Sequence, residues 1–329
     1  MTTGSDVNPG MPDADHVCFV VERCYSGIRI DSFLSRHLRN YTPWRLMRLV
    51  EAGAVRVNDM RAEWDQRVSA GQMVTVRLTV PPDQLLLPLS RPFPIVYEDP
   101  WLLVVDKPIG LVAHPVGEFQ DGTLSNILQA HLDQQTWAPG LLRPGIVHRL
   151  DRMTSGLLVV AKDQKSHREL SADFQNGRMS KSYLAIVEGR PAFHELSINR
   201  AIGHRPGGRS VLMSAADNAL NARTARTDVT VIRQFRNACL VSCRLHTGRN
   251  HQIRVHLSHV GHPILGDDFY GPHDTLKPTS HPDASATTTR HALHAAQLAF
   301  HHPILRADLT FRSSPPPDFF DLLSAHSLM

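Results

Sequence analysis

An aspartate flanked by two arginines is the first group in this sequence that could do chemistry. Asp151 stands between Arg149 and Arg152, in a polar turn that reaches Gly156 and leads into an apolar run. A carboxylate on a loop held by a rigid strand is well placed to act on a substrate, and the neighbouring cations favour its ionised form by lowering its pKa. The alternative is structural: the carboxylate accepts turn hydrogen bonds from Thr154 and the residue after it. The residues alone slightly favour this second interpretation.

Tyr183 and Arg254 are two further candidates, and each has an ordinary explanation. Tyr183 falls on a strand of alternating pattern, where an aromatic ring usually belongs to the core. Arg254 shares a predicted helix with Ile253 and Leu257, and on such a helix an arginine is usually a surface cation. Spacing alone assigns neither residue a role.

The 20 histidines of the chain raise the question of a metal site. Five of them crowd one region that ends in two carboxylates: His246, His251, His256, His259 and His262, then Asp267 and Asp268. No pair of histidines there is spaced four apart, and the spacing of His251 and His256 puts their rings on different faces of a helix. We therefore expect no metal site.

The composition excludes several classes of protein. The 329 residues are 42% hydrophobic and 20% charged, and the longest apolar runs are only a few residues long. A membrane-spanning helix needs about 18 apolar residues, so no membrane association is expected. The four cysteines form no CxxC pair and are too few for a disulfide scaffold, which indicates reduced thiols and a cytoplasmic protein.

The positions of the apolar residues divide the chain into regions. Residues 1–21 are polar and acidic and are expected to be a disordered tail. Residues 22–82 contain two amphipathic helices followed by alternating strands, a small αβ unit, and residues 83–92 form a proline-containing linker. Residues 93–325 alternate short strands and helices, which predicts an α+β domain with a mixed sheet. Residues 272–289 are predicted to be a flexible insertion.

Positive charge is concentrated in three stretches, 22–80, 143–190 and 223–256, separated by acidic ones. Such blocks suggest a polyanion-binding surface that is assembled by the fold. The alternative for any one block is that its arginines are solvated surface groups. Because each block also contains a motif described below, the polyanion surface is favoured.

Several segments of the second region resemble one enzyme family. The segment HRLDRMTSGLLVVAK at 148–162 resembles the signature of the RluA family of pseudouridine synthases, and further matches follow the family's order from about 93 to 312. The matching segments are KPIGLVAHP at 107–115, KSYLA at 181–185, TGRNHQIRVH at 247–256, and the closing stretch from Leu293 to Pro303. The resemblance implies a mainly antiparallel sheet and an enzyme that isomerises uridine to pseudouridine in RNA.

The resemblance also implies roles for individual residues. Asp151 would be the catalytic carboxylate, Tyr183 would stack on the base and remove the proton from its carbon five, and Arg254 would pair with the aspartate. Arg149 would enter the RNA stack where the uridine has left. The remaining residues expected to bind substrate are His148, Thr154, Arg249, His251, Gln252 and Ile253. The reaction needs no cofactor and no metal.

The first region resembles a second family, the S4-type RNA-binding domain named after a ribosomal small-subunit protein. The matching segments are RIDSFL at 29–34, GAVRVN at 53–58 and VSAGQ at 68–72. Gln72 replaces the usual acidic residue, and Asp59 and Met60 replace the usual Gly-Lys turn. The resemblance implies an accessory domain that binds RNA.

The expected function is therefore modification of specific uridines in structured RNA, with large-subunit ribosomal RNA favoured because members acting on it typically have the accessory domain. Two alternatives remain open from the sequence. One is an enzyme that acts on transfer RNA, and the other is a non-catalytic RNA-binding factor. Retention of Asp151, Tyr183 and Arg254 together argues for an enzyme. RNA is the only partner expected, and the protein is predicted to be a monomer.

Overall fold

The computed structural model describes residues 16–39, 41, 43–77, 86–116, 121–135, 144–207, 212–277 and 290–321. Contacts divide the chain into two compact units. One unit contains Met1–Pro88 and Leu128–Arg143, and the other contains Leu89–Ile127 and Pro144–Met329. Each unit is described by itself below.

Two short helices and a small sheet form the N-terminal unit. A turn of 3-10 helix (Arg23–Tyr25) precedes α1 (Ile30–His37) and α2 (Pro43–Glu51). Among the described residues the sheet has the order β1-β4-β2-β3, all antiparallel, with β1 at His16–Val20, β2 at Val55–Val57, β3 at Met60–Arg61 and β4 at Met73–Arg77. The apolar stripe predicted for the first helix is buried against this sheet, and its members Ile30, Phe33 and Leu34 are fully inaccessible.

The predicted disordered tail is too long, because β1 lies inside it. Residues 16–20 pair with β4 from His16 opposite Arg77 to Val20 opposite Met73. Val17 is 2% exposed and belongs to the core of the unit. The five-residue strand follows directly on an acidic, periodicity-free stretch, so the sequence pattern did not separate it from the residues before it. Residues 1–15 lie outside the described part.

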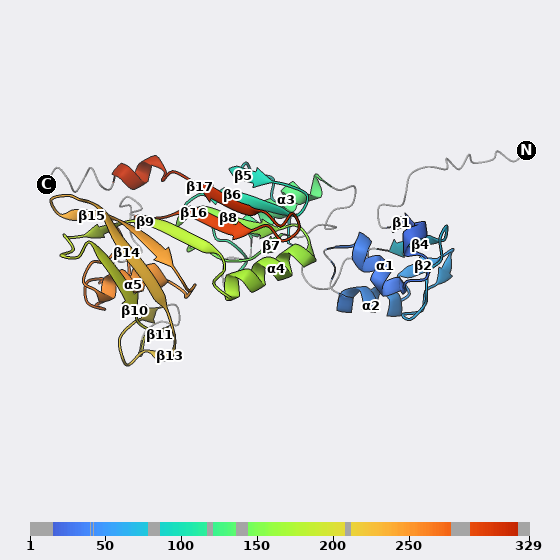
Figure 1. Ribbon diagram of the computed structural model, residues 1–329, viewed down its shortest axis with the longest axis horizontal. Coiled ribbons are helices and arrows are strands. Elements are labelled where there is room, and N and C mark those ends of the chain that lie inside the picture. The colour runs from blue at the N-terminus through green and yellow to red at the C-terminus, as the bar shows by residue number, and fades with distance from the viewer. Residues whose placement is uncertain are drawn as a thin grey trace, which may run out of the picture. The chain divides into compact units, whose positions relative to one another are not determined.

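A large mixed sheet forms the second unit (Figure 1). Among the described residues it has the order β10-β14-β15-β9-β16-β8-β6-β5, with β17 paired to β16 and β7 paired to β8. Every neighbouring pair is antiparallel except β16 and β8. Its strands are β5 (Ile95–Glu98), β6 (Leu102–Lys107), β7 (Gly145–Ile146), β8 (Ser155–Ala161), β9 (Ser180–Glu188), β10 (Glu195–Asn199), β14 (Arg226–Gln234), β15 (Ala238–Leu245), β16 (Leu293–His301) and β17 (Asp308–Arg312). The predicted α+β fold with a mainly antiparallel sheet is confirmed.

Two helices, α4 and α5, pack against this sheet. In α4 (Gln164–Gln175), the side chain of Asp163 accepts a hydrogen bond from the backbone N–H of Ser166 at 3.0 Å and so caps the N-terminus of the helix. The helix packs against β7 and β8. The other helices are α3 (Leu124–Asp133) and α5 (Gln252–His259), and α5 packs against β14.

A small separate sheet has the order β12-β11-β13. Its strands are β11 (Ile202–His204), β12 (Met213–Ser214) and β13 (Leu220–Arg223), and both pairings are antiparallel. Buried side chains of this sheet and of α5, including Ile202 and Val255, form a joint core cluster. The small sheet is therefore attached to the same helix that carries Arg254.

The one parallel pairing, between β8 and β16, requires a glycine. Gly156 has φ +113° and lies beside Ala295, and a Cβ at this position would overlap the backbone of Ala295. Only glycine combines this backbone angle with so close an approach of a second strand. The pairing fixes the start of β8, and with it the loop that carries Asp151.

The predicted flexible insertion 272–289 is described only up to residue 277. That part is an ordered turn, because the N–H of Gly271 donates to the carbonyl oxygen of Thr275 at 2.9 Å. The ammonium of Lys277 also pairs with the carboxylate of Glu188 at 2.8 Å. The prediction of a flexible insertion is therefore wrong for residues 272–277, and residues 278–289 lie outside the described part. No helix among the described residues has both the length and the apolar character to cross a membrane.

Candidate active site

A pocket of about 420 Å³ opens beside the Asp151 loop. Its walls come from residues 146–154, which lead from β7 into β8, from β9, and from residues 248–254 at the start of α5. All ten predicted site residues line it: His148, Arg149, Asp151, Thr154, Tyr183, Arg249, His251, Gln252, Ile253 and Arg254. The fold thus brings together segments that are a hundred residues apart in the sequence.

Arg254 connects Asp151 with a second, fully buried carboxylate. Its Nη1 donates to Oδ2 of Asp151 at 3.1 Å, and its Nε and Nη2 donate to the two oxygens of Asp267 at 2.7 and 2.9 Å. Arg254 is 4% exposed, so it is not the surface cation of the ordinary interpretation. The bidentate pair with Asp267 fixes the guanidinium, and one N–H of Nη1 is directed to Asp151.

The side chain of Asp151 faces this arginine and does not close its own turn. The turn is held by the backbone, because the N–H of Thr154 donates to the carbonyl oxygen of Asp151 at 3.0 Å. Oδ1 of Asp151 accepts no hydrogen bond from any described residue, while Oδ2 is bound by Arg254. The alternative interpretation, in which the carboxylate of Asp151 accepts hydrogen bonds from its own turn, is therefore wrong.

Asp151 is held in its charged form. Burial alone would raise the pKa of the carboxyl, but its electrostatic interactions with His251, Arg254 and His291 and the hydrogen bond from Arg254 hold the pKa below its ordinary value. For Arg254, burial opposes the charge, yet the pairing with Asp267 and the charge of Asp151 raise the pKa above its usual value. At neutral pH both groups are ionised.

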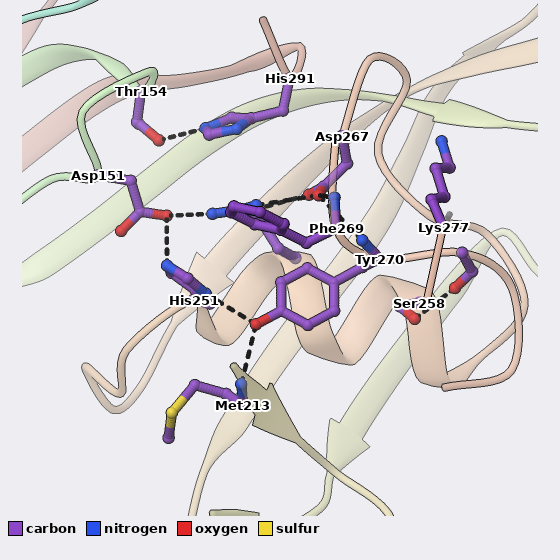
Figure 2. Close-up of polar contacts among 12 residues, drawn as sticks. Asp151, Thr154, Met213, His251, Ser258, Asp267, Phe269, Tyr270, Lys277 and His291 are labelled. Atoms are coloured by element: carbon purple, nitrogen blue, oxygen red, sulfur yellow. Dashed lines mark hydrogen bonds and ion pairs between the residues drawn. The ribbon is translucent and has the colours of Figure 1, made fainter. Parts of the chain in front are cut away.

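His251 stands in a row between Asp151 and Tyr270 (Figure 2). Its Nδ1 lies 2.7 Å from the phenol oxygen of Tyr270, and its Nε2 lies 3.9 Å from Oδ2 of Asp151. The phenol oxygen also accepts the backbone N–H of Met213 at 3.0 Å. Burial lowers the pKa of His251 to about 4, so the ring is neutral at pH 7.

The hydrogen bonds around Tyr270 select one tautomer of His251. With the phenol oxygen accepting from Met213, the phenol proton is free to donate to Nδ1 of the ring. The ring proton is then on Nε2 and points toward the carboxylate of Asp151. In the opposite tautomer an unprotonated Nε2 would face a negative charge, which is unfavourable.

Two buried side chains, Lys107 and Thr154, hold the Asp151 loop in place through hydrogen bonds. The ammonium of Lys107 donates to the carbonyl oxygens of Pro108, Leu111 and Arg152 at 2.8, 3.0 and 3.2 Å. The hydroxyl of Thr154 lies 2.8 Å from Nε2 of His291. The hydroxyl of Thr154 is therefore used to hold the loop in place and is not available to a substrate in the pocket.

Tyr183 lies at the centre of β9 and reaches the pocket while being 6% exposed. It is paired with Cys243 of β15 on one side and Ala295 of β16 on the other. Burial, together with the charge of Asp151, raises the pKa of the phenol well above its usual value. The group is thus the protonated phenol, which can take up a proton only while it gives up its own.

His148 and Gln252 line the pocket but use their polar atoms within the protein. The ring of His148 stacks on Phe174 at 5.5 Å, its Nε2 accepts the N–H of Val159 at 3.4 Å, and burial lowers its pKa to about 3. The amide of Gln252 accepts two hydrogen bonds, from Thr247 and the N–H of Arg249. It also donates two, to the carbonyl oxygen of residue 226 and the hydroxyl of residue 227. Both residues shape the pocket.

Two arginines at the pocket are available to an anion. Arg149 is exposed and has no hydrogen-bond or ion-pair partner among the described residues. Arg249 donates through Nε to the carbonyl oxygen of Thr224 at 3.0 Å, and its terminal nitrogens have no partner among the described residues. Ile253, 4% exposed, contributes an apolar wall.

Comparison with known proteins agrees with this geometry. Residues 101–259 match the family model described as RNA pseudouridylate synthase. An RNA pseudouridine synthase of Bacillus subtilis, itself uncharacterised, is 36% identical over 90% of this chain and 93% of its own length. The chain belongs to the RluA family of RNA pseudouridine synthases.

Further relatives and two solved structures fit the same family. Ribosomal large subunit pseudouridine synthase D of Zymomonas mobilis is 36% identical over 89% of this chain and 92% of its own, and that of Nitrosomonas europaea is 37% identical over 91% and 85%. The solved structure of human RNA pseudouridylate synthase domain containing 4 has a TM-score of 0.56 at 26% identity, covering 70% of this chain and 92% of its own. That of human RNA pseudouridylate synthase domain containing 1 has a TM-score of 0.54 at 28% identity, covering 68% and 84%.

The sequence analysis of this pseudouridine synthase missed several groups at the site. Asp267 and Tyr270 organise Arg254 and His251, and Lys181 lies in the pocket with its ammonium 4.0 Å above the ring of Phe174. Asp267 had been noticed only as a possible metal ligand. The sequence signal for Asp267 was its position directly after Gly266, because a Gly-Asp pair is typical of an ordered turn. In the structure Gly266 has φ +74°, as such a turn requires. Among the described residues no three histidine, cysteine or acidic side chains come together as a metal site would require.

Proposed function

We propose that this pseudouridine synthase isomerises uridines of large-subunit ribosomal RNA, with Asp151 as the catalytic group. The observation that carries the proposal is the ionised Asp151 held by Arg254 in a pocket of about 420 Å³, with one carboxylate oxygen that has no partner among the described residues. The names of two relatives as ribosomal large subunit enzymes support the choice of RNA.

The reaction requires that the bond from the sugar to N1 of the base breaks, that a bond from the sugar to carbon five forms, and that a proton leaves carbon five. N1 takes up a proton, so substrate and product are isomers and no co-reactant is needed. Asp151 would assist the departure of the base as nucleophile or as fixed negative charge. Arg254 would keep the carboxylate ionised and oriented.

Tyr183 would stack on the flipped base and receive the proton of carbon five. Because its phenol is protonated, this step requires that its own proton moves on at the same time, and Asp151 is the charged neighbour that acts on its pKa. Arg149, exposed and without a described partner, would occupy the gap in the RNA stack, since extruding a base costs a few kcal/mol.

The N-terminal unit would bind RNA as an S4-type domain that contains residues 22–82 and is extended at its start by β1. Support comes from its own buried core and from two exposed arginines, Arg36 in the last turn of α1 and Arg39 just after the helix. We further propose that the protein acts in the cytoplasm as a monomer. Light scattering would then give a mass near 36.7 kDa.

The test is release of tritium from RNA labelled at carbon five of uridine. Asp151→Asn should reduce release from protein-free large-subunit ribosomal RNA by roughly 1,000-fold or more, while RNA binding stays within about twofold. Asp308→Asn, at an aspartate whose side chain is 93% exposed on β17, serves as the matched control. Parallel loss of binding and turnover would make Asp151 structural. Release from transfer RNA alone would overturn the proposed substrate, and tight binding without any release would favour a binding factor.

A further inference from the structure

A second hollow adjoins the active-site pocket. It has a volume of about 740 Å³ and is lined by the three-stranded β11-β12-β13 sheet together with residues 248–250. Gly248, Arg249 and Asn250 line both cavities, so the second one, which we call the flanking groove, continues from the first. A ligand longer than one nucleotide can pass from the pocket into the groove without leaving the protein surface.

The side chains that line the flanking groove suit an anion with hydrogen-bonding groups. Its polar lining consists of His204, Asn221, Arg223, Arg249 and Asn250 and includes no carboxylate among the described residues. The side chain of Arg223 is exposed and makes no hydrogen bond or ion pair with a described residue. An unpaired arginine next to a second one is well matched to phosphate oxygens.

Both arginines are held near each other through the backbone. Arg249 donates to the carbonyl oxygen of Thr224, which directly follows Arg223 in the chain. Its backbone N–H is in turn fixed by the side chain of Gln252 at 2.9 Å. Arg249 is thus tied to the residue that directly follows Arg223, and both arginines line the groove where it meets the pocket.

The backbone of the groove is shaped by a bulge. The pairing of β11 with β13 shifts register between Ile202 and His204, and Asn221 opposite adopts a left-handed conformation with φ 53°. Gly203 lies so close to Ala222 that a Cβ would overlap its backbone. Bulges and left-handed residues other than glycine cost stability and are concentrated where side chains are directed at ligands.

Hydrogen bonds hold the groove at a fixed place relative to Asp151. Met213 lines the groove from β12, and its backbone N–H donates to the phenol of Tyr270. Tyr270 contacts His251, which faces Asp151, and Figure 2 shows these residues in one row. A nucleotide bound in the groove would thus lie at a set distance from the base bound in the pocket.

We propose that the flanking groove is a second nucleotide subsite, which binds the nucleotide next to the target uridine, with Arg223 and Arg249 on the phosphate that joins the two. The amides of Asn221 and Asn250 are placed to contact the base or ribose of that neighbour, as expected for recognition of unstacked RNA. The inference rests on the proposed function, because it takes RNA to be the substrate. It makes the groove a determinant of which uridines are accepted.

The experiment measures kcat and KM for tritium release from protein-free large-subunit ribosomal RNA. Arg223→Ala should raise KM about tenfold, the loss expected for one charge-assisted hydrogen bond, with kcat within about twofold of wild type. The slope of log Kd against log salt should fall in magnitude by about 1, as for one phosphate contact. Arg223→Lys should restore most of the affinity, since lysine keeps the charge.

Arg236→Ala is the matched control, because Arg236 is exposed at the β14–β15 turn, at the opposite end of those strands from the pocket. Equal effects of Arg223→Ala and Arg236→Ala on KM would overturn the subsite. A fall in kcat at unchanged KM would do the same, since it would place Arg223 in the chemistry.

The two proposals fail in different ways. If wild type releases no tritium, the proposed function fails. The subsite is then still tested by the Kd of the same RNA for the Asp151→Asn protein with and without Arg223→Ala. Equal Kd values for these two proteins would exclude the subsite whatever the outcome for turnover.

Discussion

Arg254 donates more hydrogen bonds to Asp267 than to Asp151. This difference leaves Asp151 partly free to act on a substrate. Asp267 takes two N–H groups of the guanidinium and its side chain is completely buried, whereas Asp151 takes one and keeps an oxygen to which no described residue donates. If Asp151 were the only carboxylate, the arginine could bind it with both ends of its fork. Asp267 prevents this because it already binds Nε and Nη2 of the guanidinium. Asp151 therefore remains charged, with only one of its oxygens bound by Arg254.

The substitution Tyr270→Phe tests whether the tautomer of His251 influences the pKa of Asp151. Without the phenol, Nδ1 loses its donor, the Nε2 proton is no longer fixed toward Asp151, and the pKa of Asp151 rises toward its ordinary value. Activity requires ionised Asp151, so the acid limb of kcat/KM should move to higher pH by about half a unit or more. The measurement is tritium release between pH 4 and 8.

Tyr97→Phe is the control for that change, because it removes a phenol that donates to Asp99 at 2.9 Å, on β5 outside the pocket. A Tyr270→Phe profile that superimposes on wild type after scaling would show that the phenol has only a packing role. The Tyr97→Phe profile should superimpose in either case.

At the scale of secondary-structure elements, the site depends on the parallel pairing of β8 with β16. It places the start of β8, directly after the Asp151 loop, beside His294 and Ala295. The hydroxyl of Ser155 lies 3.0 Å from Nδ1 of His294, which ties the two strands together. Since the other pairings in the sheet are antiparallel and could form without it, this contact decides where the loop is held.

Gly156→Ala should therefore be costly. The substitution places a Cβ against the backbone of Ala295 at a φ that alanine disfavours, and we expect a loss of at least about 3 kcal/mol in the free energy of unfolding. Gly122→Ala shares a positive φ of +70° but meets nothing within 4 Å, and it should cost only about 1 kcal/mol. Urea unfolding of both variants gives the comparison, and equal losses would refute the strand-contact argument.

At the scale of the whole molecule, buried neutral histidines make stability depend on pH. Burial lowers the pKa of His148 and His291 to about 3 and that of His251 and His256 to about 4. Their pKa in the unfolded chain is about 6.5, so between pH 4 and 6.5 the unfolded chain binds more protons. The stability from these groups is complete above pH 6.5 and is lost as pH falls toward 4.

His256→Gln tests this pH dependence away from the pocket. His256 is fully buried between the hydroxyl of Thr227 and the carbonyl oxygen of Arg200, and an amide can satisfy both partners without titrating. Between pH 5 and 6 the slope of unfolding free energy against pH should decrease by about 1 kcal/mol per pH unit. An unchanged slope would mean that His256 is not the neutral group described.

RNA binding by the N-terminal unit is the second question at this scale. Replacing Arg36 and Arg39 by alanine should reduce the salt slope of ribosomal RNA binding by about 2 and leave kcat on saturating RNA unchanged. Both side chains are exposed, so the melting temperature should not change, and calorimetry provides that control. An unaltered salt slope would argue against an RNA-binding role for these two arginines.

The sequence by itself determined the family, the α+β class and ten of the residues that line the pocket, because the motifs are long and contiguous. It also located most helices, since caps such as Asp163 and apolar stripes act within a few residues. It could not decide between the two interpretations of Asp151, because a carboxylate beside Thr154 can bind its own turn or a partner far away.

Only the tertiary structure decided which partners these residues meet. Asp267 and Tyr270 became part of the site because α5, the turn after it and β12 pack together, and no local pattern encodes those contacts. The same holds for His148 and Gln252, whose polar atoms are used by Val159 and by the loop before α5. Local propensity extends over a few residues, whereas pKa values and hydrogen-bond partners depend on which distant segments are buried against each other.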